Sequence, residues 1–155
     1  MIRVQSDPFD PARELASFCA GRSDVGGIAV FIGRVRAQDG GTRILAMTLE
    51  HYPGMTERKL EEIEAEARRR WPLHDCLVVH RYGRMQPGEP IVLVATAADH
   101  RRDAIEAMNF LIDWLKTRAP FWKLEETPEG ARWVEARASD DAAAARWERA
   151  AAEPA

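Results

Sequence analysis

The sequence predicts an α+β fold in a single domain of 155 residues. The hydrophobic patterns give the element order α-β-β-α-β-β-α-β, which lacks the strict alternation of strand and helix found in parallel sheets. Hydrophobic residues make up 46% of the chain and charged residues 30%, as in ordinary globular domains. No repeat, linker or change of composition divides the chain. We therefore expect one domain over residues 1–155, with a frayed tail over about 148–155.

Capping residues and apolar alternation predict the first helix and the two strands after it. Asp10 can accept hydrogen bonds from the free amides of a helix start, and Pro11 suits the first helical position. Apolar residues alternate over 25–37, as in a strand. A glycine turn at 39–41 leads to a second apolar run over 43–52. We expect these two strands to form a hairpin.

A helix over 56–71 is predicted by three features. Thr56 can cap its start, apolar residues recur at helical spacing, and Pro72 prevents its continuation. Its charges change from acidic to basic along the segment, which matches the helix dipole. The arginine run at 68–70 is therefore interpreted as a solvated helix end.

The second half of the chain contains three further strands and a long helix, predicted at 75–83, 89–98, 132–136 and 101–118. Pro120 prevents the long helix from continuing. The face that this helix is expected to bury consists of Ala104, Ile105, Met108, Leu111, Ile112 and Leu115. Residues 139–152 are interpreted as a capped helix or a frayed tail.

Charge and cysteine content restrict the function classes. A net charge of −3 argues against a general nucleic-acid binder, so any anion site must come from a local cluster of basic residues. Cys19 and Cys76 form no CxxC pair, and two free thiols are expected. The chain has no run of about 18 apolar residues. These features favour a cytoplasmic protein.

The sequence lacks the common motifs for phosphate loops, dinucleotide binding, serine nucleophiles and zinc. We therefore expect no metal and no cofactor. His80 falls within an apolar strand pattern and is interpreted as a buried core histidine rather than a catalyst.

Three groups of basic residues remain. Arg34 and Arg36 are expected on one face where a strand ends. His100 and Arg101 stand at a helix start, where free amides and the dipole favour anions. The third group is KTRAPFWK at 116–123, at the far end of the same helix.

Lys116 alone is explained as a cation that stabilises the helix end, or as a partner of Asp113. Lys123 differs because it directly follows two aromatic residues, which hold its stem beside apolar surface. Pro120 fixes the corner between the lysines. Two preset lysines suit an anionic substrate or a carbonyl that gains negative charge during reaction. The residues alone thus indicate a phosphate- or carboxylate-bearing ligand.

Several motifs together resemble the MoaE family, the large, catalytic subunits of molybdopterin synthase. They are FIGRVR at 31–36, LEHYPGMTE at 49–57, HR at 100–101, LKTRAPFWK at 115–123 and TPEGARWVEA at 127–136. They occur in family order, and the resemblance extends from about residue 3 to residue 147.

The resemblance implies an α/β hammerhead-type fold with an antiparallel sheet and an additional small β-subdomain. It further implies a homodimer with a small ubiquitin-like sulfur-carrier subunit of the MoaD type at each end, a heterotetramer. The carrier's C-terminal Gly-Gly thiocarboxylate would deliver two sulfurs to cyclic pyranopterin monophosphate, forming the dithiolene of molybdopterin. Because the sulfur comes from the carrier, no reactive cysteine motif is needed.

The resemblance also implies roles for single residues. Lys116 matches the lysine nearest the carrier's C-terminus, and Lys123 matches the second essential lysine, so both are predicted to be catalytic. The predicted substrate-binding residues are Phe31, Arg34, Val35, Arg36, His100, Arg101, Ile112, Leu124, Glu125 and Arg137. His100 and Arg101 match residues that the other subunit of the dimer contributes. At Leu124 the family commonly has a basic residue.

Two other function classes remain open. A non-catalytic module would bind a phosphorylated ligand or a protein tail without chemistry. A single-stranded nucleic-acid binder would stack bases on Phe121 and Trp122, although the acidic net charge argues against it.

Overall fold

The computed structural model, which describes residues 1–152, contains two four-stranded sheets and one short hairpin. The strands of the first sheet follow the order β1-β6-β8-β2, namely Ile2–Gln5, Leu73–Arg81, Pro90–Ala98 and Gly27–Arg34. Only β1 runs parallel to its neighbour, β6, and the other pairs are antiparallel. This sheet confirms the predicted α+β class.

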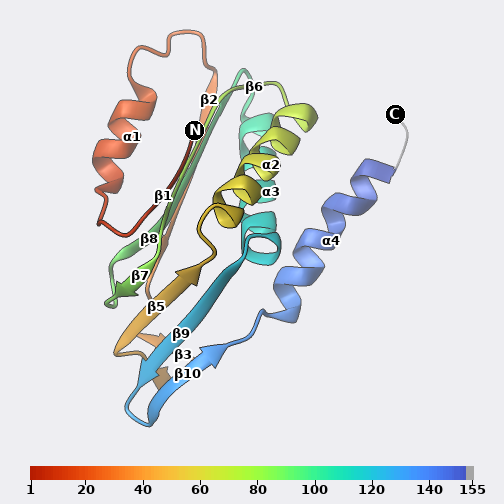
Figure 1. The fold of residues 1–155 in the computed structure, drawn as a ribbon. Coiled ribbons are helices and arrows are strands. Elements are labelled where there is room, and N and C mark those ends of the chain that lie inside the picture. The colour runs from red at the N-terminus through yellow and green to blue at the C-terminus, as the bar shows by residue number, and fades with distance from the viewer. Residues whose placement is uncertain (153–155) are drawn as a thin grey trace.

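The second sheet is antiparallel throughout and has the order β10-β9-β5-β7, namely Gly130–Val134, Phe121–Thr127, Ala46–His51 and Gly83–Met85. It extends beyond the first sheet, and the hairpin of β3 (Gln38–Asp39) and β4 (Thr42–Arg43) lies close to it (Figure 1). These strands form the additional β-region expected from the resemblance.

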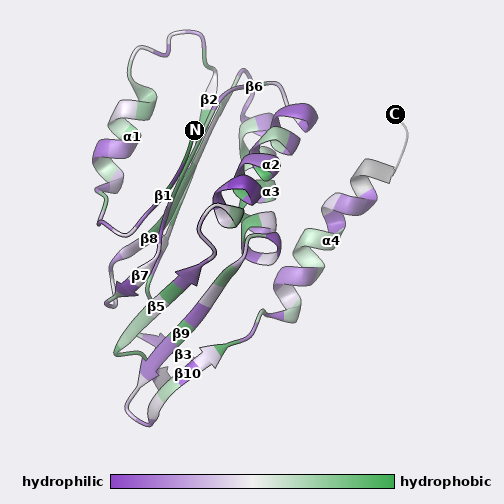
Figure 2. Cartoon of the chain, in the orientation of Figure 1, coloured by the Kyte–Doolittle hydropathy of each residue, from purple (hydrophilic) through white to green (hydrophobic). Residues whose placement is uncertain are grey.

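Helices cover both faces of the first sheet. Helix α1 (Pro11–Cys19) lies on one side, and α2 (Met55–Arg70) and α3 (Arg101–Arg118) lie on the other (Figure 1). Helix α4 (Ala138–Ala152) packs against α3. Hydrophilic residues predominate in α2 (Figure 2), which therefore buries only a narrow apolar stripe. No helix within residues 1–152 is long and apolar enough to span a membrane.

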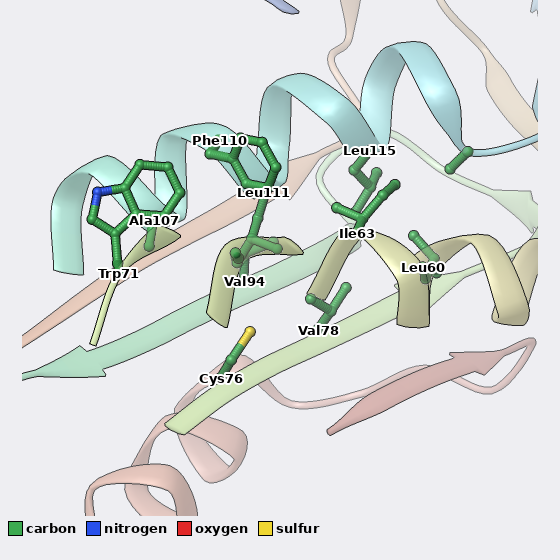
Figure 3. Close-up of a cluster of buried hydrophobic side chains, with 12 residues drawn as sticks. Leu60, Ile63, Trp71, Cys76, Val78, Val94, Ala107, Phe110, Leu111 and Leu115 are labelled. Carbon is green, nitrogen blue, oxygen red and sulfur yellow. The ribbon is translucent and has the colours of Figure 1, made fainter. Parts of the chain in front are cut away.

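The main core lies between α2, α3 and the strands β6 and β8 (Figure 3). Its buried side chains include Leu60, Ile63, Trp71, Cys76, Val78, Val94, Phe110, Leu111 and Leu115. Both cysteines are free, Cys19 exposed and Cys76 buried, as the sequence predicts. Burial raises the pKa of the Cys76 thiol to about 12, which keeps it protonated and unreactive.

The predicted hairpin between the apolar runs 25–37 and 43–52 is wrong. Strand β2 pairs with β8 along its whole length, whereas β5 pairs with β7 and β9 in the other sheet. The chain crosses between sheets because the apolar residues of β5 have their own cluster, which includes Val35, Ile44 and Met85. The glycine turn forms only the two-residue strands β3 and β4.

The start of α2 also differs from the prediction. Gly54, with φ of 81°, occupies the position before the helix, and Glu57 accepts the Gly54 N–H at 2.7 Å. Thr56 lies inside the first turn, fully buried. Its hydroxyl donates to the Pro120 carbonyl at 3.1 Å and accepts the Tyr52 N–H at 2.9 Å. Thr56 therefore connects α2 to the chain that follows α3 instead of capping the helix.

Helix α3 has the predicted bounds, but its buried face is shifted. Ile105 is 46% exposed, whereas Ala107 and Phe110 are fully buried. Phe110 packs between two indoles, with ring centroids 5.4 Å from Trp71 and 5.7 Å from Trp147 of α4. Helix α4 extends to Ala152 and so includes residues 148–152 of the expected tail. Residues 153–155 of that predicted tail lie outside the described residues.

Candidate active site

The corner between α3 and β9 sets the positions of the two predicted catalytic lysines. Lys116 lies in the last turn of α3, and Pro120 separates that helix from β9, which carries Lys123. Alternation along β9 places Phe121, Lys123 and Glu125 on one face and Leu124 on the other. The structure therefore does not bring Leu124 to the side of Lys123.

A buried carboxylate holds Lys123. Glu125 is only 4% exposed, and its oxygens lie 3.6 Å from the Lys123 ammonium and 3.1 Å from the Arg132 guanidinium. Arg132 stands directly opposite Glu125 in the β9–β10 ladder. A buried carboxylate is unfavourable unless cations pair with it. Glu125 therefore keeps both Lys123 and Arg132 beside it. Of the predicted residues, Lys123 and Glu125 are thus brought together.

A second carboxylate, Asp39 of the β3–β4 hairpin, binds two arginines. The Arg137 guanidinium donates to both Asp39 oxygens at 2.8 and 2.9 Å, and Arg36 donates at 3.0 Å. The hydrogen bond from Arg137, followed by the charges of Arg36, Arg137 and Lys123, lowers the pKa of Asp39. Lys123 therefore lies within electrostatic range of Asp39.

Lys116 joins this cluster through Asp140 in the first turn of α4. Its ammonium lies 3.8 Å from an Asp140 oxygen, and the Asp140 N–H donates to the Arg137 carbonyl at 2.9 Å. Asp39 raises the pKa of Arg137 most, and Asp140 and Glu125 contribute to the same shift. The predicted partner of Lys116, Asp113, instead binds Arg146 and the Trp147 indole.

The resulting group, which we call the basic cluster, combines residues from four separate segments. Its cations are Arg36, Lys116, Lys123, Arg132 and Arg137, and its carboxylates are Asp39, Glu125 and Asp140. The five cations outnumber the three carboxylates by two. The cluster therefore attracts anions although the whole chain is acidic.

His80 supports the strand that carries Lys123. It is fully buried, its ring stacks on Phe121 at 4.0 Å between centroids, and its Nδ1 donates to the Arg81 carbonyl at 2.9 Å. Burial lowers the pKa of His80 to about 4, so the ring is neutral near pH 7. The interpretation of His80 as a core histidine is confirmed.

Arg34 and Arg36 do not share a face, contrary to the prediction. Strand β2 ends at Arg34, whose guanidinium donates to the Gly88 carbonyl at 2.6 and 2.9 Å, whereas Arg36 faces Asp39. Val35 between them is buried, its N–H donates to Glu89, and its carbonyl accepts from Gly88. Arg34 and Val35 thus anchor the chain that presents Arg36.

The remaining predicted residues are spread along the molecule. Phe31 and Ile112 are half-buried, and Ile112 packs on the main core. His100 and Arg101 are exposed at the start of α3, in an open hollow of about 510 Å³ that also includes Asp99 and Arg102. At 1.5 Å per residue, about 22 Å of helix separates Arg101 from Lys116. A single chain therefore does not bring these groups together.

Asp39, Asp140 and Arg132 are site residues that the sequence analysis missed. Asp39 falls in a turn and Asp140 in a helix start, where acidic residues need no functional explanation. Arg132 could have been found, because a β9–β10 hairpin around Pro128 places it opposite Glu125. The sequence suggests Phe121 and Trp122 as surfaces on which bases could stack. His80 covers Phe121, so of the two only Trp122, which is 47% exposed, is open for stacking.

Comparisons with known proteins identify the family. The family described as MoaE protein matches residues 4–118. The chain is 54% identical over 147 residues to the molybdopterin synthase catalytic subunit of Pseudomonas aeruginosa, covering 95% of this chain and 98% of that relative. The chain belongs to the MoaE family.

Solved structures of MoaE proteins share the fold. The MoaE protein from Burkholderia ambifaria superposes with a TM-score of 0.80 at 53% identity, covering 96% of this chain and 97% of that chain. Molybdopterin synthase from Staphylococcus aureus gives a TM-score of 0.78 at 30% identity, covering 86% and 96%. The predicted fold class, enzyme class and role in molybdenum cofactor biosynthesis are confirmed for this MoaE chain.

Proposed function

We propose that the basic cluster is where this MoaE chain transfers sulfur to cyclic pyranopterin monophosphate. The sulfur arrives as the C-terminal thiocarboxylate of a small MoaD-type carrier, whose extended Gly-Gly tail reaches the cluster. The thiocarboxylate sulfur bonds to a substrate carbon and displaces an oxygen substituent, whose carbon–oxygen bond breaks as the oxygen takes up a proton. Water then cleaves the acyl carbon–sulfur bond, which leaves the sulfur on the substrate and a carboxylate on the carrier. A second carrier delivers the second sulfur of the dithiolene.

The observation that carries this proposal is the convergence of Lys116, Lys123, Arg36 and Arg137 in one cluster with excess positive charge. Both reactants are anions, and an oxyanion develops on the acyl carbon when water attacks it. Cations fixed in advance by Glu125, Asp39 and Asp140 stabilise such charge without rearranging during the reaction.

The cations have different roles in the proposal. Lys116 neutralises the incoming thiocarboxylate and the oxyanion. Lys123 positions the pterin ring and exchanges protons with it. Arg36 and Arg137 hold the substrate phosphate, because a guanidinium group can donate two parallel hydrogen bonds to it.

His100 and Arg101 complete the phosphate site from a second copy of the chain. Their distance along α3 from Lys116 supports this assignment, because a dimer can place the start of one α3 beside the cluster of its partner. The assembly is then a homodimer with two carriers. We place it in the cytoplasm, which the two free thiols support.

Lys123→Ala separates catalysis from mere binding. The proposal predicts that the variant binds the carrier and the cyclic pterin with nearly unchanged Kd, while kcat falls by about 10²–10³, the usual effect of losing one preorganised charge. Calorimetry gives the Kd values, and a single-turnover assay gives the rate. Lys59→Ala is the matched control, because Lys59 pairs with Glu62 on α2, outside the cluster. Binding that weakens in proportion to activity would instead favour a non-catalytic module.

A further inference from the structure

Asp39 occupies the two arginines that the proposed function assigns to the substrate phosphate. One nitrogen of Arg137 contacts both Asp39 oxygens, and a nitrogen of Arg36 contacts the first of these oxygens. The Asp39 side chain is only 17% exposed, less than those of Arg36 at 60% and Arg137 at 49%. The carboxylate therefore lies against both guanidinium groups and is less open to solvent than either.

The local fold does not explain this carboxylate. Asp39 pairs with Thr42 through the β3–β4 ladder, and the turn between them uses Gly40 and Gly41, with φ of 56° and 83°. A side chain that shaped the turn would accept backbone N–H groups. Within residues 1–152, every side-chain hydrogen bond of Asp39 goes to Arg36 or Arg137.

We infer that Asp39 is a resident counter-ion, which competes with the substrate phosphate for Arg36 and Arg137. The inference rests on the proposed function and adds a specificity-determining residue to it. A carboxylate and a phosphate use the same kind of guanidinium donor, and Asp39 holds the Nη2 nitrogens of both arginines, so a phosphate must displace Asp39 to reach these two donors. Because Asp39 is tethered to the hairpin, its effective concentration at the arginines is high.

This competition selects ligands by charge. A neutral pterin gains little at these donors, because Asp39 already compensates the charge of both arginines. A phosphate-bearing pterin replaces the carboxylate with a stronger acceptor at the two arginines. The site thus rejects uncharged pterins at the cost of weaker binding of the correct substrate.

Asp39→Asn tests the inference because it removes the charge and keeps the shape. Inorganic phosphate is titrated into the protein at low salt by calorimetry, with Glu62→Gln as the control. Glu62 is an exposed carboxylate of α2 bonded to Lys59, so its loss changes the net charge equally without touching the cluster. We expect Asp39→Asn to bind phosphate about tenfold more tightly, a change typical of one charged hydrogen-bonding group, and Glu62→Gln to bind like wild type.

Further arms distinguish the alternatives. In the double variant Asp39→Asn with Arg137→Gln, we expect the tighter phosphate binding to be lost. With the cyclic pterin as substrate, we expect Asp39→Asn alone to lower KM and to retain kcat. Unchanged or weaker phosphate binding by Asp39→Asn overturns the inference, and Asp39 is then a residue that positions the arginines. Absence of phosphate binding in every variant overturns both the inference and the phosphate site. Tighter phosphate binding in a protein that forms no dithiolene contradicts only the proposed sulfur transfer.

Discussion

The buried imidazole of His80 makes the stability of the chain sensitive to acid. Its ring is packed against Phe121, two residues before Lys123 on the same face of β9. The native protein keeps His80 neutral down to about pH 4, whereas an unfolded chain protonates this ring near pH 6.5. Between these values the unfolded state binds more protons, so stability falls as the pH falls.

His80→Phe should weaken this pH dependence. The lowered pKa corresponds to about 3 kcal/mol of unfolding free energy lost by wild type between neutral pH and pH 4. Urea unfolding at pH 7.5 and pH 4.5 measures the loss, which should be smaller in the variant. His74→Gln is the control with opposite sign. Its hydrogen bond with Asp99 raises the pKa of His74, so its contribution is present at low pH and is lost as the pH rises. An equal pH dependence in wild type and His80→Phe would contradict the burial argument.

Single residues differ in how far the sequence reveals them. Lys116 and Lys123 stand out because a proline corner with two aromatics between cations has no role in ordinary folding. Asp39 and Asp140 do not stand out, because acidic residues are common in turns and at helix starts. Their role comes from neighbours almost 100 and 24 positions away, Arg137 and Lys116, which no local pattern contains.

Elements whose signal is local are the ones that the sequence predicts best. Helix α3 has the predicted bounds because its apolar period and Pro120 are both within the segment. Strands β6 and β8 lie close to the predicted ranges 75–83 and 89–98. In contrast, β1 has only four residues and β9 carries alternating charges, so neither shows an apolar run.

The errors at element scale come from contacts distant in sequence. The apolar runs 25–37 and 43–52 are adjacent in sequence and therefore suggest a hairpin, but each pairs with another strand instead. Thr56 is a plausible helix cap from the sequence, but its hydroxyl donates to the Pro120 carbonyl, which comes from the chain after α3. Ile105 is predicted to be buried, but Phe110 takes that place and packs against Trp147 of α4. Tertiary packing thus decided which of several locally acceptable arrangements formed.

At the scale of the whole molecule, the basic cluster has a consequence for assembly. One chain supplies Lys116, Lys123, Arg36 and Arg137 together, but it leaves Arg101 at the opposite end of α3. If a second copy completes the site, each active site of a dimer contains Lys116 from one chain and Arg101 from the other.

Mixing two inactive variants tests this shared site. Arg101→Ala and Lys116→Ala are each expected to be inactive as homodimers. After subunit exchange at equal amounts, half of the dimers are mixed and one of their two sites is intact, which predicts about a quarter of wild-type activity for a symmetric dimer. A product assay before and after exchange measures it. Activity that stays at the level of the separate variants would contradict a site shared between two chains.

The central claim is that the cations at the α3–β9 corner carry out sulfur transfer, and Lys116→Ala tests it most directly. Purified protein is mixed with thiocarboxylated carrier and cyclic pyranopterin monophosphate, and the dithiolene product is quantified by mass spectrometry. The side chain of Lys116 is half exposed, so the variant should fold normally, as circular dichroism can verify. We predict product formation by wild type and by Lys59→Ala, and a decrease of about 10²–10³ in rate for Lys116→Ala. Near-normal turnover by a folded Lys116→Ala protein would contradict the account.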